Sequence, residues 1–200
     1  LSLISGGDIT LQNAHLKNVT VFIEEVKKVG GDVEEKDGKV RFFLKDTLLP
    51  SNIITAREPG FKTDWQGPWA ILMTQATGES TIHETIYENR FGYASELNKM
   101  GARIDFFDPK VNNPEQVYNF NFEKGASYNQ AIKIIGPQKL HNAVLSITDL
   151  RAGATIVMAA LIATGESVVY GVEHVERGYE DFDKRLRFLG ADILCQEDVV

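Results

Sequence analysis

The stretch Thr148–Ala154 combines an acid and a base in a pattern typical of the start of a helix. Asp149 follows Thr148, and Arg151 comes two residues later, ahead of the apolar run Thr155–Ala163. An Asp at such a place accepts hydrogen bonds from the free backbone N–H groups of the first helical turn. The helix dipole disfavours a cation in that turn, so Arg151 needs an anionic partner. The sequence leaves two partners open, Asp149 or a bound anion.

Acids and arginines recur before the other predicted helices. Asp64 belongs to a second Thr-Asp pair, which precedes the apolar run 69–73. Two acid–arginine pairs precede amphipathic segments: Glu88 with Arg90, and Glu176 with Arg177. Helix N-termini and arginines attract anions, and a remaining carboxylate can act as a general base. If these helix starts meet at one end of the fold, they form a rim for an anionic substrate. Taken singly, each acid can be explained as an N-cap, and each arginine as one partner of a surface ion pair.

Internal repetition indicates which elements position these residues. The pentapeptide Ala-Thr-Gly-Glu-Ser occurs at Ala76–Ser80 and again at Ala163–Ser167, each time closing an apolar run with a glycine. Neither run has a polar stripe, which predicts two helices buried on all sides. The opening Ile4–Asp8 resembles the tail of a third such helix. We therefore expect the chain to be a fragment of a longer protein.

Each repeated unit continues with a strand, an amphipathic helix and a glycine. Short strands are expected at 9–11, 81–82 and 168–170, and amphipathic helices around 19–29, 93–100 and 179–189. A strand should follow each glycine, at Asp32-Val33, Ala102–Ile104 and Ala191–Ile193. Strands at Lys39–Leu44 and Ala131–Ile135 complete the first two units, whereas the third reaches Val200 without a closing strand. Because each unit has one wholly apolar helix, we expect the helices to pack inside and the sheets to lie outside. The segment Phe106–Gln130 is interpreted as an inserted loop or hairpin.

Composition limits the function classes. The 200 residues are 43% hydrophobic and 24% charged, as expected for a folded globular chain, and the net charge of -7 argues against nucleic-acid binding. The single Cys195 excludes an intrachain disulfide and is expected to pack within a strand. No targeting segment or span of roughly 20 apolar residues is seen, so we expect a cytoplasmic chain without membrane contact. The scattered histidines lack metal-ligand spacing, and no metal or cofactor is expected: His15, His83, His141 and His174.

Five motifs in a fixed order carry a resemblance to a known family. They are Pro59–Asp64, Glu84–Phe91, Glu96–Ala102, Thr148–Ala152 and His174–Glu180. Together they resemble the C-terminal half of the UDP-N-acetylglucosamine 1-carboxyvinyltransferases, enolpyruvyl transferases of peptidoglycan synthesis, over nearly the whole chain. The resemblance implies an α/β fold, an inside-out barrel of three pseudo-repeated units. Residues 1–200 would form one of two similar domains, with an insertion at about 107–128.

The resemblance also implies an activity and site residues. Enolpyruvyl would pass from phosphoenolpyruvate to the 3-hydroxyl of UDP-N-acetylglucosamine, in the cleft between the two domains, with release of phosphate. Asp64 would contact that hydroxyl as the candidate general base, and Ile86 would bind the nucleotide sugar largely through its backbone, with Tyr87 nearby. The remaining implied roles are these: Arg177 would hold phosphoenolpyruvate, and Glu88, Asp149 and Arg151 would line the site and support charge and proton handling.

Some features of the family fall outside this sequence or differ in it. The family's reactive cysteine, a lysine and further anion-binding arginines belong to an N-terminal domain that is absent here, so this chain should not catalyse alone. Lys62 replaces a proline, and Gly67-Pro68 predicts a delayed start of the regular helix. Two alternatives stay open. One is another enolpyruvyl transferase, such as that of the shikimate pathway, and the other is a non-catalytic paralogue that binds a nucleotide sugar.

Overall fold

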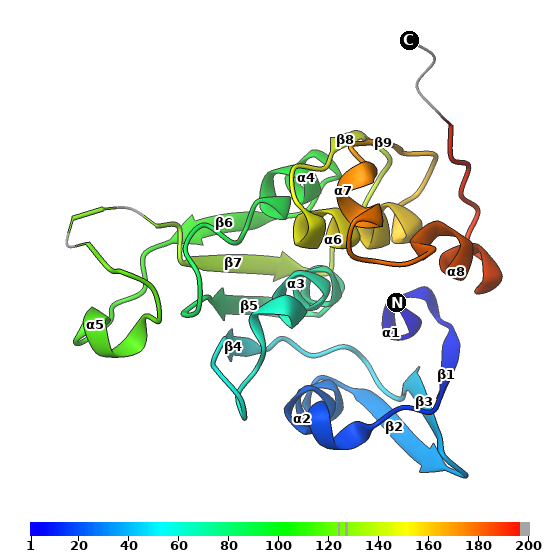
Figure 1. The fold of residues 1–200 in the computed structure, drawn as a ribbon, viewed down its shortest axis with the longest axis horizontal. Helices are drawn as coiled ribbons and strands as arrows, with labels where there is room; N and C mark the ends of the chain where they lie inside the picture. The colour runs from blue at the N-terminus through cyan, green and yellow to red at the C-terminus, as the bar shows by residue number, and fades with distance from the viewer. Residues whose placement is uncertain (124, 127, 197–200) are drawn as a thin grey trace.

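A computed structural model of the chain describes residues 1–123, 125–126 and 128–196 and shows an α/β fold (Figure 1). Its strands form three small sheets, in the orders β1-β3-β2, β4-β5-β7-β6 and β8-β9. Within the described residues, no helix combines the length and apolar character that crossing a membrane requires.

The first part of the chain forms the three-stranded sheet. Its elements are α1 (Ser2–Ser5), β1 (Asp8–Gln12), α2 (Thr20–Lys28), β2 (Gly31–Lys36) and β3 (Lys39–Leu44). Both β1 and β2 pair antiparallel with β3, which lies between them. Helix α1 ends at Gly6, whose φ of 68° is the left-handed conformation of a glycine helix stop, as the sequence predicts.

The middle part forms the four-stranded sheet. Its elements are β4 (Asn52–Ile54), a 3-10 turn (Thr63–Trp65), α3 (Gln66–Thr74), β5 (Gly78–His83), α4 (Tyr93–Lys99), β6 (Ile104–Phe107), α5 (Pro114–Val117) and β7 (Ala131–Gly136). Strand β4 runs parallel to β5, whereas β5 and β6 both run antiparallel to β7. The order β5-β7-β6 repeats the order β1-β3-β2, with the last strand of each unit between the other two.

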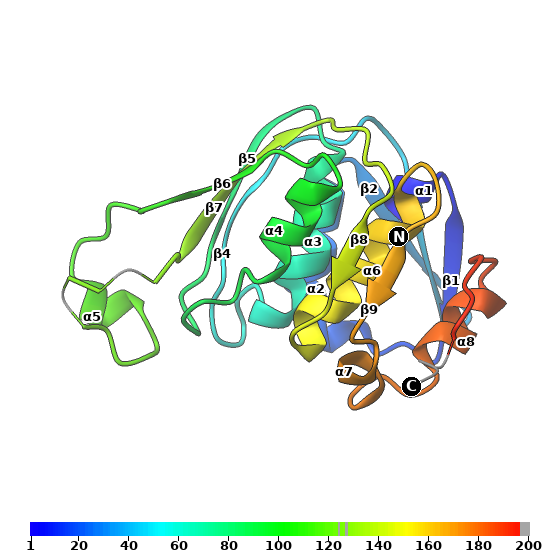
Figure 2. The same cartoon turned by 90° about the horizontal axis from the view of Figure 1, so that it is seen from above.

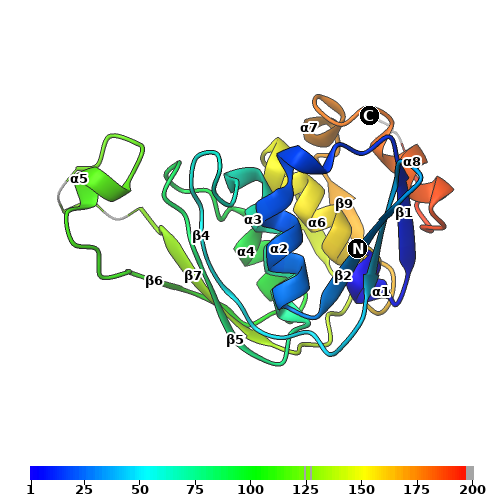
Figure 3. The same ribbon diagram turned by 90° about the horizontal axis from the view of Figure 1, so that it is seen from below.

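The last part contributes a parallel strand pair and three helices. Its elements are β8 (Val144–Ser146), α6 (Leu150–Ile162), β9 (Val168–Tyr170), α7 (Glu173–Glu176) and α8 (Phe182–Phe188). Figures 2 and 3 show α2, α3, α4 and α6 side by side in the middle of the molecule. The four-stranded sheet lies on one side of these helices and the three-stranded sheet on the other (Figures 2 and 3).

The two apolar helices differ in how fully they are buried. In α3 every residue but Pro68 is buried, as the sequence predicts. In α6 residues 152–156 are buried, but beyond Ile156 only Ala159 is, and Val157 and Met158 stay partly exposed. The prediction of burial on all sides is therefore wrong for α6. The reason is that α3 packs against its first half, at Thr155, while no element of the described chain fully covers the second half.

The third unit does not form the strand predicted after its glycine. Residues 191–196 have no strand structure, although Gly190 ends the preceding helix with a φ of 97°. In the first two units this strand pairs with a returning strand, β2 with β3 and β6 with β7. No returning strand is seen for the third unit in the described residues, and its predicted end at Val200 lies outside them. Without that partner Cys195 is exposed, which corrects the expectation that it packs in a strand.

The predicted insertion, which contains α5, projects from the end of the four-stranded sheet (Figure 1). Its described residues form a loop with one short helix rather than a hairpin. Tyr118 stacks on Phe122 with ring centroids 5.2 Å apart and lies 5.1 Å from Phe120. Its hydroxyl is 3.1 Å from Nε2 of His83, the last residue of β5. Aromatic packing therefore attaches this loop to the sheet.

Candidate functional site

The first turns of α3 and α6 lie side by side because the two helices approach closely at one glycine. A Cβ atom added to Gly67 would lie 2.1 Å from Oγ1 of Thr155, so only a glycine allows this approach. The 3-10 turn that holds Asp64 directly precedes α3, as expected for a delayed helix start, and Arg151 lies one turn before Thr155 in α6. The close approach therefore brings Asp64 and Arg151 together.

Arg151 is paired with Asp64, and its partner is not Asp149. Its guanidinium Nε donates to Oδ1 of Asp64, 87 residues earlier in the chain. This hydrogen bond raises the pKa of Arg151, and the phenols of Tyr87 and Tyr179 add smaller contributions in the same direction. An ion pair between Arg151 and Asp149, which the sequence left open, is not formed.

Asp149 instead caps α6, as its place in the sequence predicts. Its Oδ1 accepts hydrogen bonds from the backbone N–H groups of Arg151 at 2.9 Å and Ala152 at 3.0 Å. The extended backbone of Asp149, with φ of -151°, folds its carboxylate over the first turn of the helix. That geometry directs the carboxylate to the backbone and leaves the Arg151 side chain free to reach α3.

A second arginine joins Asp64 from the loop before α4. Nη2 of Arg90 lies 3.3 Å from Oδ1 of Asp64, and the Arg90 side chain is only 17% exposed. Its guanidinium also lies 4.9 Å from the centre of the Tyr87 ring. Asp64, which makes no cap hydrogen bond to α3, therefore sits between two guanidinium groups. This corner, formed by Asp64, Arg90 and Arg151, carries one negative and two positive charges and is suited to an anionic ligand.

Two buried side chains, Glu84 and Gln130, form hydrogen bonds to the backbone of the loop that carries Ile86 and Tyr87. Oε1 of Glu84 accepts hydrogen bonds from the backbone N–H groups of Ile86 at 2.7 Å and Tyr87 at 3.2 Å. Nε2 of Gln130 donates to the carbonyls of Glu84 and Tyr87, at 2.8 and 3.0 Å. Because the N–H of Ile86 is already used, the backbone group that Ile86 can offer a ligand is its carbonyl.

Glu88 and Arg177 are exposed, and the structure does not bring them into contact with Asp64. Neither makes a side-chain hydrogen bond or ion pair to any other described residue. Gly178, next to Arg177, packs against the first residue of α6, since an added Cβ would lie 2.6 Å from Cδ2 of Leu150. Arg177 therefore lies at the same end of the fold as the corner, with its charge available to a ligand.

Two residues that matter to the geometry were not among the residues assigned from sequence. The rim predicted from sequence includes Arg90 without a specific role, and Glu84 lies only within the motif Glu84–Phe91. No clear signal marked Glu84 in the sequence, because the strand before it, Gly78–His83, is itself mostly polar. Nothing local identified its partners, which come from other elements.

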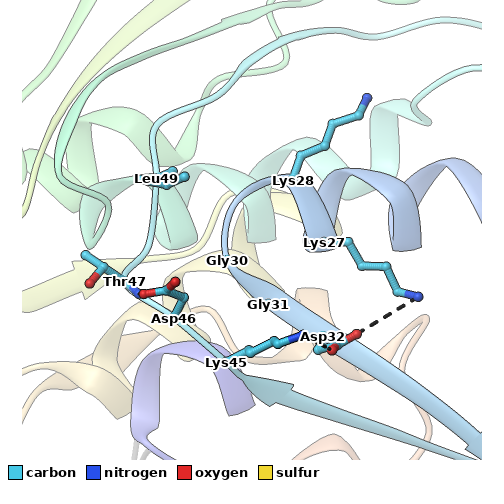
Figure 4. Close-up of a pocket in the computed structure, with 9 residues that line it drawn as sticks. All are labelled: Lys27, Lys28, Gly30, Gly31, Asp32, Lys45, Asp46, Thr47 and Leu49. Carbon is cyan, nitrogen blue, oxygen red and sulfur yellow. Dashed lines mark hydrogen bonds and ion pairs between the residues drawn. The ribbon is translucent and has the colours of Figure 1, made fainter.

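A hollow of about 410 Å³ lies elsewhere, beside the C-terminal end of α2 (Figure 4). Asp32 lies 4.0 Å from the amine of Lys27 and 3.3 Å from that of Lys45, so the Asp32 carboxylate in this hollow is paired with two lysines. None of the residues predicted for the site lines this hollow. The lining residues are Lys27, Lys28, Gly30, Gly31, Asp32, Lys45, Asp46, Thr47 and Leu49.

Comparison with known proteins gives one family. The family model described as EPSP synthase (3-phosphoshikimate 1-carboxyvinyltransferase) matches residues 1–186. A curated relative from Protochlamydia amoebophila, named UDP-N-acetylglucosamine 1-carboxyvinyltransferase, is 35% identical over 98% of this chain and 42% of its own length. A relative of the same name from Chlamydia trachomatis is 36% identical over 99% of this chain and 44% of its own. The chain thus spans less than half the length of these relatives.

Solved structures support the same fold. The enolpyruvyl transferase NikO from Streptomyces tendae matches 87% of this chain and 36% of its own, with a TM-score of 0.71 and 28% identity. EPSP synthase from Acinetobacter baumannii matches 98% of this chain and 41% of its own, with a TM-score of 0.58. At 17% identity this second likeness shows the fold alone.

Proposed function

Because the chain belongs to the EPSP synthase family of enolpyruvyl transferases, we propose that its full-length protein transfers enolpyruvyl from phosphoenolpyruvate to UDP-N-acetylglucosamine. The acceptor is the 3-hydroxyl of the sugar. Its oxygen bonds to C2 of phosphoenolpyruvate, the C2–O bond to phosphate breaks, and the hydroxyl proton is lost. The reaction would take place in the cytoplasm and supply a peptidoglycan precursor. The names of the relatives at 35% and 36% identity support this acceptor.

The arrangement of Asp64 between Arg90 and Arg151 carries the proposal. Both substrates are phosphorylated, so the site needs cations, and the acceptor hydroxyl needs a carboxylate that can receive its proton. In this proposal Asp64 is the general base, and the two arginines neutralise substrate charge. Arg177, which has no partner among the described residues, holds phosphoenolpyruvate.

Further roles in the proposal follow from position. Ile86 offers its carbonyl to the nucleotide sugar, and the exposed ring of Tyr87 packs beside it. Asp149 keeps the first turn of α6 in place and thereby aims Arg151 at the substrates. Glu88 lines the same loop and supports proton handling.

The proposal includes the architecture of the longer protein. Residues 1–200 form one enolpyruvyl-transferase-type domain, an inside-out barrel of three units with an insertion at about 107–128. The repeated strand order in the first two sheets supports this description. The other domain of the full-length protein closes the substrate cleft, and this chain contributes one wall.

Phosphate release by the purified full-length protein tests the function. With phosphoenolpyruvate present, we expect release that depends on UDP-N-acetylglucosamine and that shikimate 3-phosphate does not support. Preference for shikimate 3-phosphate would favour the shikimate-type alternative. Binding of the nucleotide sugar by calorimetry, without phosphate release from either acceptor, would instead identify a non-catalytic paralogue.

A further inference from the structure

Glu84 is a buried acid placed between the two parts of the candidate site. It directly follows β5, and its exposed fraction is 0%. One carboxylate oxygen, Oε2, accepts hydrogen bonds from Oγ1 of Thr63 at 2.8 Å and from Nε2 of Gln66 at 3.1 Å. The other oxygen, Oε1, holds the backbone N–H groups of Ile86 and Tyr87. A single carboxylate thus joins the turn that carries Asp64 to the loop that carries Ile86.

This carboxylate has several donors but no cation. No Lys, Arg or His nitrogen of the described chain lies within ion-pair distance of Glu84. Burying an isolated carboxylate is costly, and here hydrogen bonds alone offset that cost. An apolar side chain of similar size would leave both backbone N–H groups of the loop without an acceptor. The need to hold both the turn and the loop accounts for an acid at this position.

The surrounding network is rigid and extends into α4. The Tyr93 hydroxyl donates to Oε1 of Gln66 at 2.8 Å, which fixes the orientation of the Gln66 amide toward Glu84. Burial, followed by the charge of Glu84, raises the pKa of Tyr93, so this phenol stays a donor. Both Gln66 and Tyr93 are buried, at 2% exposure each. The carboxylate is therefore held in one position by neighbours that cannot move into solvent.

We propose that Glu84 is a positioning residue that sets the distance between the general base Asp64 and the sugar-binding carbonyl of Ile86. It does not touch the substrates itself. It acts through Thr63, which is adjacent to Asp64, and through the backbone of Ile86 and Tyr87. This inference rests on the proposed function for its kinetic consequence, whereas the hydrogen bonds on which it depends are independent of any activity.

Three variants of the full-length protein test the hydrogen bonds that Glu84 makes to the Thr63 turn and to the Ile86 loop. Glu84→Ala removes both sets of hydrogen bonds. We expect kcat/KM for the nucleotide sugar to fall about 100-fold, since small displacements of reacting groups have effects of that size. Thr63→Val removes only the hydroxyl that links Glu84 to the turn carrying Asp64. It should lower kcat about 10-fold and leave KM for the nucleotide sugar within about 2-fold. Glu84→Gln keeps a side-chain oxygen that can accept from the loop amides, so its kcat/KM should lie between those of Glu84→Ala and wild type.

Glu96→Ala is the matched control. Glu96 is also a largely buried acid, 9% exposed, and it also accepts a hydrogen bond from a backbone N–H, that of Ser146 at 3.1 Å. It lies in α4, away from the corner. This variant should lose thermal stability comparably to Glu84→Ala while kcat/KM stays within about 3-fold of wild type.

Hydrogen exchange separates a failure of this inference from a failure of the proposed function. In Glu84→Ala the amides of Ile86 and Tyr87 should exchange at least about 10-fold faster than in wild type, and in Glu96→Ala they should not. If wild type shows no turnover, the proposed function fails and exchange alone decides the role of Glu84. The inference would be overturned if the Ile86 and Tyr87 amides exchanged at the same rate in Glu84→Ala and Glu96→Ala. In an active protein, the same kcat/KM for these two variants would also overturn it.

Discussion

At the scale of single residues, the ion pair between Asp64 and Arg151 is too exposed to be explained by stability. The side chains of Asp64 and Arg151 are 59% and 49% exposed, and pairs of that kind contribute about 0–1 kcal/mol. Two arginines gathered on one exposed carboxylate make better sense as groups held ready for a ligand. In the proposed function, Arg90 and Arg151 turn from Asp64 to a substrate phosphate.

Replacing Asp64 tests its proposed role as the base. In the full-length protein, Asp64→Ala should lower kcat by about 100-fold or more, because the acceptor hydroxyl loses the group that takes its proton. The melting temperature should change little, since the Asp64 side chain is 59% exposed in both of its ion pairs. Steady-state phosphate release and a thermal melt measure the two quantities.

Asp8 provides the matched control for that variant. It too pairs with an arginine on the surface, Nη2 of Arg41 at 2.5 Å, and its side chain is 47% exposed. Asp8→Ala should leave kcat near the wild-type value. If Asp64→Ala retains near-normal turnover as well, Asp64 is not the general base.

At the scale of elements, the contact between α3 and α6 decides whether the corner exists. Each helix starts where its own sequence directs, yet Asp64 and Arg151 meet only because the helices touch at Gly67 and Thr155. A glycine inside a helix is normally unfavourable by about 1 kcal/mol relative to alanine. Its presence in a buried helix therefore indicates that close approach outweighs helix propensity here.

Gly67→Ala tests the importance of this approach. The new Cβ would meet the Thr155 side chain, whose Oγ1 and Cβ would lie at 2.1 and 3.3 Å. Because Thr155 is β-branched and buried at 1% exposure, it cannot turn away, and we expect a loss of about 1–3 kcal/mol in unfolding free energy. Urea unfolding measures this loss.

The double variant Gly67→Ala/Thr155→Ala provides the control. It removes Oγ1 and Cγ2 of Thr155 and should recover much of the lost stability. A Gly67→Ala variant as stable as wild type would show that the helices can separate at little cost and that the close approach does not hold the corner together.

At the scale of the whole molecule, the proposed function makes the corner of Asp64, Arg90 and Arg151 one wall of a cleft. The chain carries a net charge of -7, and its positive corner is local and solvent-exposed. Charge-stabilised chemistry needs a site from which bulk water is largely excluded. We therefore propose that a second domain closes the site, in keeping with relatives of which this chain covers 42% and 44%.

The isolated 200-residue chain should show no phosphate release under conditions in which the full-length protein is active. Its affinity for UDP-N-acetylglucosamine should be at least about 100-fold weaker, because ligand contacts from the other wall are missing. Calorimetry and the phosphate assay provide the two measurements. Turnover by the isolated chain would contradict the proposal that its site is only one wall of the cleft.

Local features of the fold were well predicted from sequence, and features that depend on distant partners were not. The glycine stop at Gly6, the cap at Asp149 and the burial of all of α3 but Pro68 each follow from a few neighbouring residues. The strand at 191–193 was wrongly predicted because its pattern matches those of the other units, yet a strand also needs a neighbouring strand to bond with. Exposure of the second half of α6 has the same kind of cause.

The sequence by itself determined local features such as the glycine stop at Gly6 and the cap at Asp149, because backbone hydrogen bonding acts over a few residues. It also determined the family, through five ordered motifs. Only the tertiary structure decided that Arg151 pairs with Asp64 across 87 residues and that Glu84 joins Thr63 to the Ile86 loop. The physical reason is that a charged side chain takes whichever partner packing brings near, and packing depends on contacts such as that of Gly67 with Thr155.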